Sequence, residues 1–230
     1  MLWCDKATFW QGDYALTADL QIAAGKVTAV IGPSGAGKST LLGGIAGFHP
    51  QKAGRLLWQD RDITSVTPDK RPVSMLFQDN NLFPHLTVMQ NVALAVEPRL
   101  RPCAQTRTRV EAMLVRVGLA GLADRKPAAL SGGQQSRAAL ARALLQDRAV
   151  MLMDEPFSAL GPALKAEMLD LSVELAIAAE RTVVMVTHDP ADAAQVADAI
   201  IGVVAGVAMA PIQTSSFLSD PPRQIKEYLG

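Results

Sequence analysis

Continuous apolar segments alternate with segments of mixed polarity along the chain. The apolar segments are rich in β-branched residues and short enough to be strands that are buried on both faces. The segments between them repeat apolar residues at helical spacing. This alternation predicts an α/β fold with a parallel sheet that helices cover on both faces. The strand candidates are residues 27–31, 55–58, 73–77, 149–153 and 182–187, and the helix candidates that accompany them are residues 38–48, 162–179 and 191–197.

Residues 79–146 have a different character, because helical segments and prolines dominate there. Thr87, Thr106 and Ser131 are each placed to cap a helix. The sequence therefore predicts a helical lobe, residues 79–146, inserted into a core that makes up the rest of a single domain. The helices that we expect in this lobe are residues 88–95, 107–117 and 132–145, and the core comprises residues 1–78 and 147–230.

The most apolar segment, residues 199–212, is shorter than the roughly 20 residues that a membrane-spanning helix needs, and it contains glycines and a proline. We expect buried strands with a turn at Ala205 and Gly206, followed by a short closing helix at residues 221–229. The first residues lack the basic and apolar regions of a signal peptide, so we expect none.

Charge and cysteine content argue against several classes of function. Lys plus Arg and Asp plus Glu each number 22, so the formal net charge is zero. The basic excess of a nucleic-acid-binding surface is therefore missing, and we expect no nucleic-acid partner. Cys4 and Cys103 form neither a disulfide framework nor a metal-binding spacing, which favours a reducing compartment.

A glycine-rich segment after the strand at residues 27–31 fits the phosphate-binding pattern G-x-x-x-x-G-K-[ST]. Its N–H groups would surround phosphate oxygens, Lys38 would neutralise the β- and γ-phosphates, and the Ser39 hydroxyl would ligate Mg²⁺. Gly35 and Gly37 would let the backbone approach the phosphates. The alternative is an ordinary strand–helix turn, but the strand before and the helix after favour the phosphate loop. The predicted ATP contacts of this loop are Gly32, Pro33, Ser34, Gly35, Ala36, Gly37, Lys38, Ser39 and Thr40.

Polar residues also follow three other predicted strands. Asp154 and Glu155 come after one of them; Asp154 would hold Mg²⁺ through its water shell, and Glu155 could orient or deprotonate a water that attacks the γ-phosphate. Gln78 and His188 follow two further strands. Taken alone, Gln78 is a loop residue and His188 a structural histidine. Ligands nevertheless collect at the carboxyl ends of parallel strands, so we expect these side chains to share one site.

Residues 130–134, with the sequence LSGGQ, form a second candidate anion site at the start of a helix. A serine and two glycines in this position present a hydroxyl and bare N–H groups to an anion. Two anion-binding helix starts in one chain suggest an active site that two copies of the chain share.

The order of these motifs resembles the ATP-binding subunits of ABC transporters over nearly the whole chain. The resemblance implies a P-loop NTPase fold with a mostly parallel core sheet, an N-terminal antiparallel β lobe and the inserted helical lobe. It implies that a homodimer hydrolyses ATP with Mg²⁺. Gln78 would touch Mg²⁺ and the attacking water, and His188 would lie at the γ-phosphate. The residues that would contact the other subunit's ATP are Ser131, Gly132, Gly133 and Gln134.

The chain departs from the family's pattern after Glu155. The family usually has an Asp after Ser-Ala-Leu, and that Asp helps to connect the two active sites; here Gly161 follows Leu160. The family also stacks adenine on an aromatic residue about twenty positions before the phosphate loop. Trp10 is our candidate for this stacking, with Phe9 and Tyr14 as alternatives and packing of the β lobe as the structural explanation.

Residues 71–88 look similar to the corresponding segment of the ATPases of bacterial thiamine importers. This similarity implies a peripheral subunit at the cytoplasmic face of the inner membrane. It would work with integral-membrane permease subunits and, indirectly, with a periplasmic binding protein for thiamine or thiamine pyrophosphate. The alternatives are an importer of another small solute (iron, sulfate or molybdate, or a polyamine), a soluble ABC protein without a membrane partner, and a nucleotide-binding scaffold without turnover.

The family's permease contacts its ATPase in the groove between helical lobe and core. Four residues after Gln78 are candidates for this contact: Leu82, Phe83, Pro84 and Leu86. Packing of the lobe's hinge explains the same residues equally well, and the sequence does not decide between the two.

Overall fold

Parallel strands form the centre of the sheet, as the alternation of segments predicts. The computed structural model describes residues 1–229. Its central strands lie in the order β6-β7-β8-β3-β9, and each neighbouring pair is parallel. Their carboxyl ends therefore meet at one edge, where the candidate site residues follow them. These strands are β3 (Val27–Ile31), β6 (Val73–Leu76), β7 (Val150–Asp154), β8 (Thr182–Val186) and β9 (Ala199–Val204).

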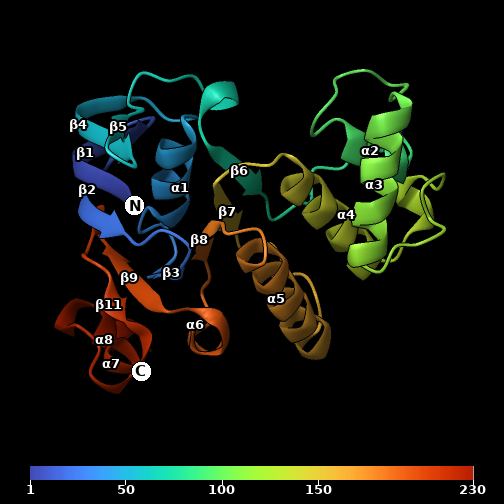
Figure 1. The fold of residues 1–230 in the computed structure, drawn as a ribbon. Coiled ribbons are helices and arrows are strands. Elements are labelled where there is room, and N and C mark those ends of the chain that lie inside the picture. The colour runs from blue at the N-terminus through green and yellow to red at the C-terminus, as the bar shows by residue number, and fades with distance from the viewer. Residues whose placement is uncertain (230) are drawn as a thin grey trace.

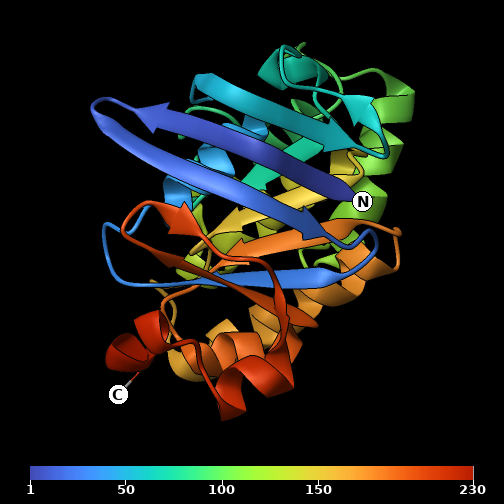
Figure 2. The same ribbon diagram turned by 90° about the vertical axis from the view of Figure 1, so that its left-hand side faces the viewer.

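An antiparallel unit continues the sheet beyond β9. β1 pairs with β2 and β4 in antiparallel fashion, β5 extends β4, and β10 joins β2 to β9. Figure 2 shows the long strands of this unit crossing the molecule above β3 and β9. Every second residue of β2 is buried, which is the pattern of a strand with one solvated face. The N-terminal antiparallel β lobe that the resemblance implies is present. Its strands are β1 (Leu2–Gln11), β2 (Tyr14–Ile22), β4 (Gln51–Trp58) and β5 (Arg61–Asp62). The connecting strand β10 (Val207–Ala208) is parallel to β2, and β11 (Ile212–Gln213) pairs with β9.

Helix α1 (Lys38–Ala46) lies between this antiparallel unit and the parallel strands (Figure 1). Leu41, Leu42 and Ile45 are completely buried in the cluster that joins the two parts of the sheet. The helix ends two residues before the predicted position, because Gly47 takes a left-handed conformation with φ 87°. The buried Arg71 guanidinium donates to the carbonyls of Gly44 and Ile45 at 2.8 and 2.7 Å, so the end of α1 has partners for its free acceptors.

The helices between β6 and β7 pack on one another, and α4 connects them to β6 and to α5 (Figure 1). Val92, Val110 and Leu140 meet Met151 and Leu169 in one buried cluster. The helices are α2 (Val88–Ala93), α3 (Ala104–Arg116), α4 (Gly132–Leu145) and α5 (Pro162–Ile177), with short 3₁₀ turns at η1 (Pro68–Lys70) and η2 (Pro127–Ala129).

Two of the three predicted helix caps are confirmed. Thr87 and Ser131 each form a capping box with the Gln three residues later. The prediction for Thr106 is wrong, because α3 begins at Ala104 with Cys103 in the capping position. The carbonyl of Cys103 accepts the N–H of Arg107 at 2.9 Å, so helical bonding starts before Thr106, whose side chain is buried in the first turn.

The remaining helices cover β3 and β9 from the side opposite α1. Ala193, Phe217 and Ile225 pack there on Ile31 and Ile200. The predicted turn between β9 and β10 is confirmed, with Ala205 and Gly206 at φ 46° and 77°. Among the described residues, no helix is both long and apolar enough to cross a membrane. The helices of this layer are α6 (Pro190–Val196), α7 (Thr214–Ser219) and α8 (Arg223–Leu229).

Candidate active site

The predicted phosphate loop connects β3 to α1, and its glycines are required for different reasons. Gly35 and Gly37 lie in the left-handed region, at φ 75° and 103°. Nothing lies within 4 Å of a Cβ on Gly35, so conformation alone explains that glycine. A Cβ on Gly32 would lie 2.0 Å from the carbonyl oxygen of Val203 in β9, so close packing explains this one. The loop is thereby fixed with its N–H groups at the start of α1, an arrangement that suits phosphate.

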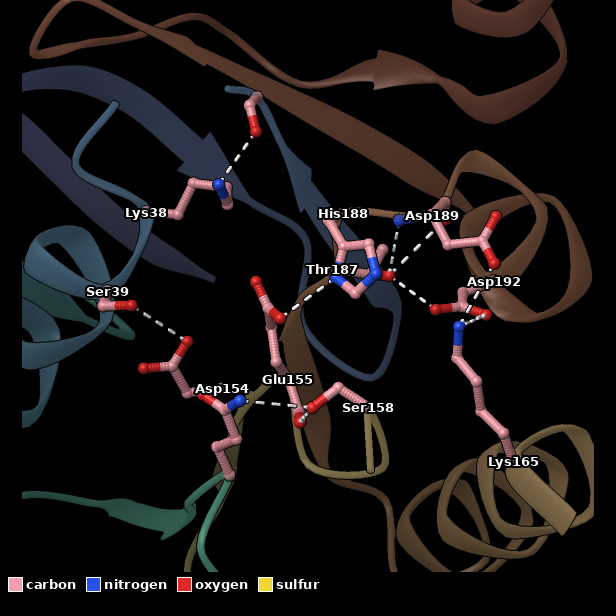
Figure 3. Close-up of polar contacts among 12 residues, drawn as sticks. Lys38, Ser39, Asp154, Glu155, Ser158, Lys165, Thr187, His188, Asp189 and Asp192 are labelled. Carbon is pink, nitrogen blue, oxygen red and sulfur yellow. Dashed lines mark hydrogen bonds and ion pairs between the residues drawn. The ribbon is translucent and has the colours of Figure 1, made fainter. Parts of the chain in front are cut away.

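Lys38 lies at the floor of this loop and is 8% exposed. Its Nζ donates to the carbonyls of Gly32 and Pro33 at 2.8 and 2.9 Å (Figure 3). Burial lowers the pKa of Lys38, while the carboxylates of Glu155 and Asp154 oppose that shift. A pocket of about 290 Å³ opens beside the loop. It is lined by Gln11, Tyr14, Ser34, Gly35, Gly37, Lys38, Ser39, Thr40 and Glu155.

Asp154 ends β7 and faces the start of α1. The Ser39 hydroxyl donates to Asp154 Oδ1 at 3.1 Å (Figure 3). Burial raises the pKa of Asp154, and the hydrogen bond from Ser39 opposes that shift. The described residues hold no cluster of three or more His, Cys, Asp or Glu that could bind a metal by itself. One hydroxyl and one carboxylate instead fit Mg²⁺, which keeps several waters and takes other oxygens from substrate phosphates.

Glu155 has a strained backbone and a direct contact to His188. Its φ is 44°, which is uncommon for a residue other than glycine. Its carbonyl accepts from both the N–H and the Oγ of Ser158, at 3.3 and 3.1 Å, and these bonds fix the conformation. Its Oε2 lies 3.0 Å from His188 Nδ1 (Figure 3). The two side chains predicted from separate strand ends are thus brought together.

Gln78 reaches the same region through Ser158. Its Nε2 donates to Ser158 Oγ at 3.3 Å, so Ser158 links Gln78 to the backbone of Glu155. Asn80 and Asn81, just after Gln78, are left-handed, and the Arg142 guanidinium of α4 donates to both of their carbonyls. Sequence reasoning missed Ser158, because a serine in a loop carries no signal of its partners.

The helix start at residues 130–134 has the predicted form. Ser131 Oγ accepts from the Gln134 N–H at 3.3 Å, and Gln134 Oε1 accepts from the Ser131 N–H at 3.0 Å. Because the serine hydroxyl acts as acceptor here, its own proton remains available for an anion. A Cβ on Gly133 would lie 2.8 Å from a methyl group of Leu164 in α5, so a larger residue here would have to displace that side chain. Within residues 1–229, no hydrogen bond joins Ser131 to the phosphate loop of its own chain.

The aromatic residues before the phosphate loop have different surroundings. Phe9 is completely buried, with its ring against Gly44, so it is excluded as a stacking platform. Tyr14 lines the phosphate-loop pocket, and its hydroxyl donates to the Ala36 carbonyl at 2.7 Å. Trp10 is half-buried, with Lys52 Nζ 3.9 Å from its ring centroid. Its stacking on adenine stays a prediction.

Two further groups of residues near the site were not predicted. Gln11 lines the pocket and accepts from the Thr40 hydroxyl at 2.8 Å. Lys165, Asp189 and Asp192 form an ion-paired cluster beside His188. Their spacing in the sequence is ordinary for helix surfaces, so no pattern distinguishes them from solvated charges.

Gly161 occupies the N-cap position of α5 with φ −65° and ψ 156°, and no side chain caps the helix. Nothing lies within 4 Å of a Cβ at this position. We therefore expect Gly161→Asp to raise the free energy of unfolding by a few tenths to about 1 kcal/mol, because the carboxylate would accept from the first turn of α5. Urea unfolding measures this. Gly161→Ala is the control and is expected to be less stable than Gly161→Asp; equal stability of the two would contradict the capping account.

Comparison with known proteins agrees with this geometry. The ABC transporter family model matches residues 16–158. The chain is 55% identical to "Thiamine import ATP-binding protein ThiQ" of Cereibacter sphaeroides. The alignment covers 100% of both chains. It is 47% identical to the protein of the same name from Yersinia pestis, over 90% of this chain and 87% of the relative.

Solved structures of ATP-binding cassettes share the fold. An ABC transporter cassette in its ADP conformation aligns with a TM-score of 0.88 at 25% identity, covering 100% of this chain and 98% of the other. A dimeric cassette in a post-hydrolysis state, bound to ADP and Pi, aligns with a TM-score of 0.78 at 28% identity, covering 93% and 99%. By sequence over its whole length and by fold, the chain belongs to the ABC transporter family, as one of its ATP-binding cassettes.

Proposed function

We propose that this chain is the ATP-hydrolysing subunit of a bacterial importer for thiamine or thiamine pyrophosphate. The observation that carries the hydrolytic part is the meeting of Lys38, Asp154, Glu155 and His188 at one edge of the sheet. The substrate part is supported by the names of relatives that are 55% and 47% identical over nearly the whole chain.

In the proposed reaction, ATP binds in the pocket beside the phosphate loop. The loop's N–H groups and the Lys38 ammonium contact the β- and γ-phosphates. Ser39, Asp154 and Gln78 would hold a Mg²⁺ ion, which neutralises phosphate charge when it is bound. Glu155 holds the attacking water and accepts its proton, and His188, 3.0 Å from Glu155, contacts the γ-phosphate.

The proposed active unit is a homodimer with a composite site. Each ATP would lie between the phosphate loop of one subunit and the helix start of the other, where Ser131, Gly132, Gly133 and Gln134 present their donors. The exposed Ser131 hydroxyl and its position outside its own chain's phosphate pocket support this arrangement. A similar cassette was solved as a dimer with ADP and Pi. In the proposed cycle, residues 79–146 move as a lobe when the dimer closes.

The proposed permease contact divides the four residues named after Gln78. Leu86 is buried, and Leu82 packs against the buried cluster of the helical segment, so both fit the hinge of that segment. Phe83 is 47% exposed and Pro84 is exposed, so they are available to a partner. A separate pocket of about 360 Å³ is lined by Phe48, which is 54% exposed, and by Phe77, the residue before Gln78. We propose that a cytoplasmic segment of the permease contacts Phe83, Pro84 and the pocket at Phe48 and Phe77, and that the subunit therefore works at the inner face of the inner membrane.

The test is ATPase activity of the complex reconstituted with its candidate permease and periplasmic binding protein. We expect thiamine-loaded binding protein to raise the ATPase rate several-fold over the complex with unloaded binding protein. An ATPase rate raised by another solute and not by thiamine would refute thiamine as the substrate, but it would leave the role as the ATP-hydrolysing subunit of an importer. Activity that never responds to permease or binding protein would favour a soluble ABC protein, and no activity in any arm would favour a scaffold without turnover.

A further inference from the structure

The backbone that carries His188 is held by a cluster of charges on two helices. Thr187, the residue before His188, is 4% exposed, and its hydroxyl donates to Asp192 Oδ2 at 2.5 Å. The same hydroxyl accepts from the N–H of Asp189, the residue after His188, at 3.0 Å. The Thr187 side chain therefore connects the residues before and after His188, and Asp192 in α6 fixes the orientation of the Thr187 hydroxyl (Figure 3).

Lys165 connects this arrangement to α5. Its Nζ lies 2.7 Å from Asp192 Oδ1 and 3.2 Å from Asp189 Oδ2. The Lys165 side chain is 17% exposed, and that of Asp192 is 10% exposed, so the pair is shielded from most of the solvent. Burial alone would lower the pKa of Lys165, but its hydrogen bonds to Asp192 and Asp189 raise it overall. Lys165 is thus the charged centre of contacts that reach both sides of His188.

Lys165 lies near the start of α5, one turn after Gly161. The helix begins at Pro162 after the N-cap Gly161, and the Lys165 N–H donates to the Gly161 carbonyl at 2.9 Å. Gly161 has no side chain with which to contact the site. Lys165 is the charged residue of the first two turns of α5 that pairs with the His188 segment.

We propose that Lys165 is a positioning residue for ATP hydrolysis, because it sets the orientation of His188 through Asp192 and Thr187. This inference rests on the proposed function, because it assumes that His188 and Glu155 act on the γ-phosphate. The alternative is a purely structural role, in which the ion pairs only hold α5 and α6 together. Gln195 offers a matched control, since its Nε2 also joins α6 to α5, at 2.7 Å from Asp170 Oδ1, but contacts neither Thr187 nor His188.

The first measurement is steady-state ATP hydrolysis by purified full-length variants, each assayed well below its own unfolding temperature. Lys165→Met is expected to lower kcat about tenfold with a KM for ATP within about twofold of wild type. Lys165→Arg, which keeps the charge, is expected to restore most of the rate. Asp192→Asn should cause a similar loss, and the double variant should lose little more, because both changes break one link. Gln195→Met should keep the wild-type kcat.

The second measurement follows the histidine ring signals by NMR. The chain has three histidines, so the ring signal of His188 can be assigned by its loss in His188→Gln. Lys165→Met is expected to shift or broaden that signal and to leave those of His49 and His85 unchanged. This readout also serves a variant that proves less stable than wild type, since it can be recorded at low temperature.

Specific outcomes would overturn the inference. A folded Lys165→Met variant with wild-type kcat, or with an unchanged His188 signal, contradicts it, and so does an equal loss in Gln195→Met. Failure of the proposed function looks different: wild-type protein would not hydrolyse ATP, or Glu155→Gln would hydrolyse it normally. In that event the His188 signal alone still decides whether Lys165 orients this segment.

Discussion

Replacing Glu155 by Gln is expected to lower the kcat of ATP hydrolysis by a factor of about 10² to 10³. The change removes the carboxylate that would accept the proton of the attacking water, but it keeps the size and polarity of the side chain. The phosphate loop, Lys38 and Asp154 stay in place, so ATP should bind with nearly the wild-type Kd. Phosphate release from ATP and equilibrium titration with nucleotide measure the two quantities separately.

The same variant is expected to accumulate as a dimer in the presence of ATP, because the dimer closes on ATP and the slow hydrolysis delays its reopening. Size-exclusion chromatography with light scattering measures the mass directly. Glu174→Gln is the matched control, since Glu174 lies on an exposed face of α5, and it should hydrolyse ATP at the wild-type rate. A Glu155→Gln variant that is only monomeric with ATP, or that hydrolyses ATP normally, would remove Glu155 from the role assigned to it.

Replacing Lys38 by Met is expected to weaken ATP binding about a hundredfold, and ATPase activity should be lost with it. The reason is that Lys38 is the buried cation of the phosphate pocket, and each hydrogen bond to a charged group contributes about 1.5 to 3 kcal/mol. Met keeps the apolar stem, so packing beneath the loop is preserved. Titration with a fluorescent ATP analogue gives the Kd.

Lys70→Met provides the comparison for Lys38→Met, because Lys70 is an exposed lysine in the turn before β6. Its affinity for the analogue should equal that of wild type. Wild-type affinity in Lys38→Met itself would mean that nucleotide binds somewhere other than the pocket beside α1.

The parallel strands were predictable because their burial on both faces leaves a continuous apolar run. The strand at residues 182–187 was placed to within one residue of β8 (Thr182–Val186). β1 and β2 were not predicted from the residues, because only continuous apolar runs were taken as strands, whereas these two alternate buried and more exposed positions. Their lobe was implied by the family resemblance alone. A helix start was predictable where the capping residue is followed three residues later by glutamine, as at Ser131. It was not predictable near Thr106, because that helix begins at Ala104, after Pro102 and the N-cap Cys103.

The site divides in the same way. Residues that follow strands, such as Asp154 and His188, could be placed together because parallel strands end at one edge of a sheet. Ser158, which joins Gln78 to Glu155, depends on the path of a loop, and that path depends on a left-handed Glu155. The Lys165 contacts depend on how α5 and α6 pack, which no local pattern encodes.

The central claim is that one ATP is held by the phosphate loop of one subunit and the Ser131 helix start of the other. It is tested most directly by mixing two inactive variants, Lys38→Met and Ser131→Arg. A mixed dimer contains one site with an intact loop and an intact Ser131, while the other site has both defects. If half of the dimers in an equal mixture are mixed, about a quarter of the wild-type ATPase rate should return. A mixture that forms mixed dimers yet shows no more activity than the two variants measured separately would contradict the shared site.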